Sequence, residues 1–262
     1  MNTITDSTNR SLLKIGGWSA IASGGFYVLV TIYIFGVLPQ YGFITDMFDD
    51  HTLLHPWVAE YPRLYQVSWI LYFFTQLCLL PVPIALANFF STAEDDSAKA
   101  LVKLSPLFGM VAIPLAMLSS ILFYATSPIT AQAYVEMASS GETQSVILTI
   151  SGLMTDTAKE IRLFSEIGLA IWLVSTGYLF YTVRNMQGIS WVSFGIGLWT
   201  LFVVVVKFFN PYAPLEDALG ILLGLAYTII GIHQIRFVNS ASNNAPVLPA
   251  PTPESLSGEI PV

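Results

Sequence analysis

Five ionisable residues stand at the ends of long apolar segments, where charged side chains are costly and often functional. Arg162 and Glu166 lie four residues apart at the start of one segment, and Lys207 lies near the end of the next. Glu216 and Asp217 begin the segment after that. All five should lie at a similar depth, so we predict an ion-paired cluster that closes the outer mouth of a helix bundle, with Lys207 contacting Asp217 or Glu166. The alternative is ordinary interfacial chemistry, in which lysine extends toward water and acids favour a helix N-terminus.

A second group of polar residues precedes the second apolar segment. His51 and His55 are spaced as two ligands on one helix face would be, and Asp49 stands nearby as a carboxylate donor. Thr52 occupies the position that the His-Glu-x-x-His motif gives to glutamate, and Pro56 disfavours helical geometry at His55. We therefore predict no metal site and keep His51, His55 and Asp49 as the alternative.

Catalytic and cofactor signatures are missing from the chain. It has no Gly-x-Ser-x-Gly, no pair of aspartates within an apolar segment and no glycine-rich phosphate loop. Its three histidines do not lie at matching depths, which disfavours haem. We name no catalytic residue and no cofactor, and we lean against an enzyme while leaving that question open. Gln76, a polar amide inside the second segment, should face the bundle and is a candidate binding residue.

The elements that would position these residues are membrane-spanning helices. The chain is 54% hydrophobic and only 10% charged, against about 25% charged residues in soluble domains. About 20 apolar residues cross a bilayer as a helix, because backbone groups cannot stay unpaired in lipid. We predict an all-α membrane bundle in residues 1–238, with six spans at 15–38, 67–90, 106–125, 165–183, 191–209 and 218–235.

Basic residues set the predicted orientation. Six of the ten lie in segments that are cytoplasmic if the N-terminus is cytoplasmic, so we predict that both termini are on that side of a bacterial inner membrane. The three outer segments then carry the whole net charge of −7. This acidic outer face attracts cations. The negative charge also argues against nucleic acid as a partner.

The connections predict two further features. The outer segment 126–166 contains an apolar run at 144–154 that is too short to span, preceded by helical residues at 131–137 and a break at Ser139-Ser140-Gly141. We expect these pieces to form a small helical outer cap, with the run as a separate docked helix. Residues 239–262 are rich in Pro, Ser and Asn and should be a disordered tail.

Small residues and prolines indicate how the spans pack. Glycine and other small residues recur every four positions in the first and sixth spans, at Gly16, Ala20, Gly24, Gly220, Gly224 and Thr228. Such stripes allow close helix contact, which we place within one chain rather than in a dimer. Pro81 and Pro83 should interrupt the second span and Pro114 the third.

The layout of the chain resembles a bacterial family of six-span membrane proteins known only as a domain of unknown function. The resemblance rests on Gly16-Gly17 at the start of the first span, Tyr61-Pro62-Arg63-Leu64-Tyr65-Gln66 before the second, and Gly177-Tyr178-Leu179-Phe180-Tyr181 before Arg184. It implies the six-span fold, but it implies no activity and transfers no site residue.

The first hypothesis for function is a non-enzymatic accessory protein that contacts the bilayer and either a membrane protein or a second copy. The alternative is a transporter of a small solute or cation with a site between spans 2 and 3. Its polar lining would have to come from Gln76, Cys78, Ser119, Ser120, Ser175 and Thr176. A third hypothesis is a membrane enzyme with an outward-facing site, which requires Glu166, Lys207 and Asp217 to meet.

Overall fold

The computed structural model describes residues 7–48, 50–137, 141–209 and 216–243, without the side chains at 7–8, 141–142, 216–219 and 241–243. All regular structure in these ranges is helical, as predicted. The main helices are α1 (Ser7–Ile32), α2 (His51–Glu60), α3 (Pro62–Leu79), α4 (Val82–Phe89), α5 (Asp96–Glu136), α6 (Gly141–Thr182), α7 (Gln187–Phe209) and α8 (Glu216–Asn243). A π-helical turn (Tyr33–Val37) and two 3-10 turns (Leu38–Tyr41 and Thr45–Phe48) lead from α1 to α2.

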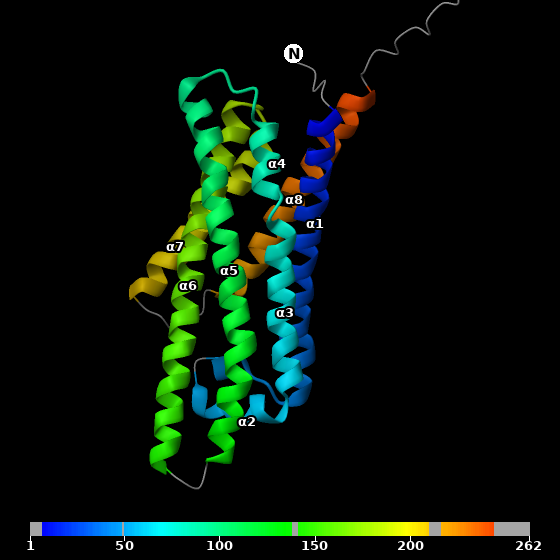
Figure 1. Ribbon diagram of the computed structural model, residues 1–262. Coiled ribbons are helices and arrows are strands. Elements are labelled where there is room, and N and C mark those ends of the chain that lie inside the picture. Colours follow the sequence, from blue (N-terminus) through cyan, green and yellow to red (C-terminus); the bar gives the residue numbers. More distant parts are fainter. Residues whose placement is uncertain (1–6, 49, 138–140, 210–215, 244–262) are drawn as a thin grey trace, which may run out of the picture.

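Within the described residues, six helical stretches are long and apolar enough to cross a membrane, which confirms the predicted number of spans. The protein is therefore a multi-pass membrane protein. The start of α1 and the end of α8 lie at one end of the bundle, called here the terminal end, and α2 lies at the opposite end, the cap end (Figure 1). Helix α8 continues to Asn243, beyond the predicted boundary at residue 238, and the rest of the predicted tail, 244–262, lies outside the described residues.

The second span is broken and the third is not. Helix α3 ends at Leu79, and α4 begins at Val82 after a short turn that contains Pro81, as the two prolines predicted. Helix α5, however, runs without interruption through Pro114. The predicted interruption there is wrong, because a proline removes only one helix hydrogen bond and a packed membrane bundle tolerates that loss.

Helices α5 and α6 form a hairpin far longer than a membrane is thick. They contain 41 and 42 residues, or roughly 60 Å each at 1.5 Å per residue, about twice the 30 Å hydrocarbon core. The expected separate helix at 144–154 is wrong, because this run is continuous with the fourth span. No proline separates the two, and the buried Ser151 and Ala158 extend one α5-facing stripe along α6. The cap therefore consists of the hairpin tip and α2 (Figure 1).

Helices α1 and α8 pack through their small residues within one chain, as predicted. A Cβ added at Gly24 would stand 2.6 Å from the carbonyl oxygen of Gly224, and one added at Gly17 would stand 3.0 Å from that of Gly231. No side chain fits between backbones this close. The two helices therefore form a tight pair beside α3 and α4 (Figure 1).

Candidate functional site

Glu166 is a buried carboxylate between two cations. Its Oε1 lies 3.2 Å from Arg162 Nε, one helical turn earlier on α6, and its Oε2 lies 3.4 Å from Lys207 Nζ near the end of α7. Glu166 is 5% exposed, so its charge has little contact with solvent. Buried charges persist only when paired and hydrogen-bonded. The predicted contact between Lys207 and Glu166 is thus present, midway along the α5–α6 hairpin where α7 ends (Figure 1).

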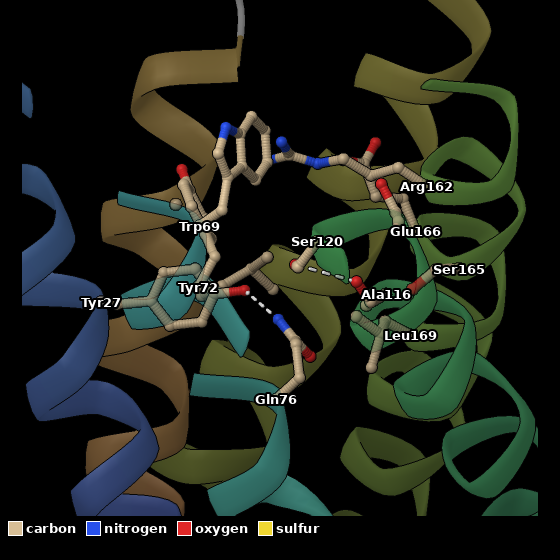
Figure 2. Close-up of a pocket in the computed structure, with 13 residues that line it drawn as sticks. Tyr27, Trp69, Tyr72, Gln76, Ala116, Ser120, Arg162, Ser165, Glu166 and Leu169 are labelled. Carbon is tan, nitrogen blue, oxygen red and sulfur yellow. Dashed lines mark hydrogen bonds and ion pairs between the residues drawn. The ribbon is translucent and has the colours of Figure 1, made fainter. Parts of the chain in front are cut away.

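Arg162 and Glu166 lie at the wall of a small cavity in the bundle. The cavity has a volume of about 30 Å³, which is enough for a water molecule. Figure 2 shows Tyr27 and Gln76 on one side and Arg162 and Glu166 on the other. The lining residues come from five helices and are Tyr27, Trp69, Tyr72, Gln76, Ala116, Ser119, Ser120, Arg162, Ser165, Glu166, Leu169, Gly220 and Leu223.

Gln76 faces this cavity and contacts a neighbouring helix. Its Nε2 donates a hydrogen bond of 3.0 Å to the hydroxyl oxygen of Tyr27. Its Oε1 is buried and accepts no hydrogen bond from the described residues. A buried amide oxygen without a hydrogen bond destabilises the folded protein by about 1–3 kcal/mol. The cavity wall thus offers an acceptor that a bound donor group would satisfy.

Three serines of α5 and α6 complete the polar lining. Ser119 donates to the carbonyl oxygen of Ala158 at 2.9 Å, and Ser120 donates to that of Ala116 at 3.0 Å. Ser165 donates to the carbonyl of Ala112 at 2.8 Å. The hydroxyl hydrogens of all three serines are therefore bonded within the bundle. Each hydroxyl oxygen still has lone pairs that can accept a hydrogen bond.

Aromatic side chains form another part of the wall, and the sequence reasoning missed them. The edge of Tyr72 meets the ring of Tyr27 with centroids 6.3 Å apart, and the Arg162 guanidinium lies 5.2 Å from the Tyr72 ring centre. Trp69 stacks on Phe123 at 4.1 Å. Tyr27 and Tyr72 carry hydroxyl groups inside apolar runs, and this was the feature of the sequence that could have identified them as lining residues.

The remaining residues proposed for these sites divide into two groups. Cys78, Ser175 and Thr176 do not line the cavity, and Ser175 instead donates to Ser105 at 2.8 Å. The side chains of Glu216 and Asp217 lie outside the described residues, although both residues belong to the first turn of α8. Whether Asp217 joins Lys207 and Glu166 therefore stays a prediction.

The two cap histidines lie on α2. Asp50 caps this helix by accepting from the backbone N–H of Thr52 at 2.9 Å. The helix continues through Pro56, so the expectation that this proline disfavours helical geometry at His55 is wrong. Burial, with a smaller contribution from His51, lowers the pKa of His55 to about 4. Asp49 lies outside the described residues, and within those residues no three metal-ligating side chains of the His, Cys, Asp and Glu types gather.

Comparisons of the chain with protein-family models, with curated proteins and with solved structures gave no match. The family resemblance noted from the sequence stays a prediction.

Proposed function

We propose that this protein binds a small polar solute in the cavity between its second and third spans and carries that solute across the membrane. The observation that carries the proposal is the buried Glu166, which pairs with Lys207 and, at the wall of the cavity, with Arg162. The same wall contains the buried Gln76 oxygen, which accepts no hydrogen bond from the described residues. Ionisable groups buried in a membrane bundle commonly mark a pathway for an ion or a solute.

The position of the cavity favours transport over an accessory role. An accessory protein needs only a close-packed bundle, and it would gain nothing from placing the Arg162–Glu166 ion pair and a buried amide oxygen around a space. The cavity is lined by Gln76 from α3 and by Ser119 and Ser120 from α5. These are the spans that the transporter hypothesis assigned to the site, and the second is broken at Pro81, as membrane helices beside solute sites often are.

The enzyme hypothesis has less support from the same residues. Both oxygens of Glu166 contact cations, so neither oxygen is free to accept a proton from a substrate. The cavity-facing serines donate their hydrogens to backbone carbonyls rather than to a base. Among the described residues that line the cavity, no nucleophile is paired with a base.

The proposal includes an orientation. Both termini lie in the cytoplasm of a bacterium, on the evidence of the basic residues, and the cap end faces outward. A volume of about 30 Å³ admits only water-sized molecules, so a larger solute requires the helices to separate.

Cysteine accessibility tests this function. A Cys78→Ser protein removes the single native cysteine, and new cysteines are then placed one at a time at Gln76, Ser119 and Ser175. Intact cells are treated with a membrane-impermeant thiol reagent. Ser175 is the matched control, because it is a buried serine of the same bundle that does not line the cavity.

We expect labelling at Gln76 and Ser119, because the separation of helices that admits a solute also admits the reagent, and none at Ser175. Gel filtration confirms that each variant is folded. Absence of labelling at both cavity positions would then refute a water-filled path and favour the accessory role over transport. Labelling at all three positions would indicate a loosely packed bundle rather than a defined site.

A further inference from the structure

His55 is a buried polar side chain without a described partner. It is 1% exposed, and neither of its ring nitrogens makes a hydrogen bond within the part of the chain that the structure describes. Its nearest ring neighbours are Tyr134 on α5, at a centroid distance of 5.3 Å, and His51 on its own helix. Buried polar groups left in this condition are rare in proteins, and a missing ion or water is a common explanation.

His51 lies next to His55 on the same face of α2. The two residues are one turn apart, and their ring centroids are 5.5 Å apart. Two imidazoles that bind one metal at about 2.0–2.1 Å from each nitrogen have ring centres at a similar separation. His51 is only partly buried, but its Nδ1 and both ring nitrogens of His55 have almost no contact with solvent, so entry of an ion requires a local movement of these side chains.

We propose that His51 and His55 bind one divalent transition-metal ion of the zinc, copper or nickel class at the cap end of the protein. Imidazole nitrogens are the preferred ligands of these ions. This site is separate from the cavity and does not depend on the proposed transport function.

The surroundings of the pair suit a cation. A metal binds imidazole through an unprotonated ring nitrogen, and neither ring nitrogen of His55 makes a hydrogen bond within the described residues. Segment 39–66 carries four acids and one arginine, which raises the local concentration of cations. Asp50 serves as the helix cap. No third protein ligand is found within the described ranges. Water molecules therefore complete the coordination shell, and we expect a moderate affinity for the metal, weaker than that of a structural zinc site with four protein ligands.

Zinc binding by the full-length protein tests this site. The purified protein carries no polyhistidine tag, is held in detergent micelles and is dialysed against Zn²⁺, and bound zinc is measured by atomic emission. The variants are His51→Gln and His55→Gln, with His233→Gln as the matched control. His233 is the third histidine of the chain and lies on α8 toward the terminal end.

We expect one zinc per chain in the wild type and in His233→Gln, and a loss of at least tenfold in affinity in His51→Gln. His51 is the primary position because it is partly exposed, so its substitution leaves the packing of the cap intact; circular dichroism confirms the fold. Equal zinc binding by the wild type and His51→Gln would overturn the site. So would an equal loss of zinc in His233→Gln, since it would indicate unspecific binding to histidines.

Discussion

Substituting Glu166 with glutamine should destabilise the protein by about 3 kcal/mol. The glutamine side chain has nearly the same shape but no charge, so Arg162 and Lys207 lose the carboxylate that lies 3.2 and 3.4 Å from them. Removing one partner of a buried ion pair costs about 3–5 kcal/mol, because the remaining charge stays buried and loses a neighbouring opposite charge. We take the lower end of this range. The Lys207 side chain is 11% exposed, whereas that of Arg162 is 29% exposed and is partly screened by water.

The assay is thermal unfolding of the purified protein in detergent, followed by circular dichroism. For a chain of this size, a change of 1 kcal/mol moves the melting temperature by about 2–4 °C, so Glu166→Gln should melt roughly 6–12 °C below the wild type. Glu160→Gln is the control, because Glu160 lies on the same helix but is exposed, and its substitution should change stability by less than about 0.5 kcal/mol.

A second variant separates charge from shape. Glu166→Gln combined with Lys207→Met removes the buried lysine charge as well, and it should recover more than half of the lost melting temperature. An unchanged melting temperature in Glu166→Gln would contradict the argument that this carboxylate compensates buried cations. Failure of the double variant to recover would place the cost in packing instead.

Three other substitutions test the packing described above. Gly24→Ala should destabilise the protein by about 1–3 kcal/mol because the added carbon overlaps α8, whereas Gly25→Ala, which meets only open space, should be close to neutral; thermal unfolding compares them. Asp50→Ala removes the cap of α2 and should cost about 1 kcal/mol, seen as faster amide exchange at the start of that helix. Arg184→Lys should lower the melting temperature, because a lysine cannot both stack between Phe89 and Phe237 and donate to the Phe89 carbonyl as the guanidinium does.

The sequence predicted the features that depend on length and depth. Runs of about 20 apolar residues identified the spans, and the positions of Lys207 and Glu166 along their segments placed both at one level of the bundle. It did not predict where α6 begins, because residues 155–164 are polar enough to resemble a loop and yet contain nothing that breaks a helix. Polarity marks contact with water, and a helix can continue into water.

The cavity walls were harder to predict than its charges. Whether Tyr27 and Tyr72 face lipid or the bundle depends on the rotation of α1 and α3, which is set by contacts with distant residues such as Gln76 and Tyr227. The apolar spans carry almost no periodic signal that would fix this rotation, since lipid and core are equally apolar. The unpartnered nitrogens of His55 likewise follow from packing against α5 rather than from its place in the chain.

The hydrogen bonds between α5 and α6 restrict how the cavity can change size. Ser119 donates to the backbone of α6 at Ala158, one turn before Arg162, and Ser165, next to Glu166, donates to the backbone of α5, so these two helices are connected at two points along the cavity. On the opposite wall, glycine contacts fasten α1 to α8. Each wall therefore behaves as one rigid body. Enlargement of the cavity must come from rocking of the α1–α8 pair against the α5–α6 hairpin, with α3 as the element between them that absorbs the displacement.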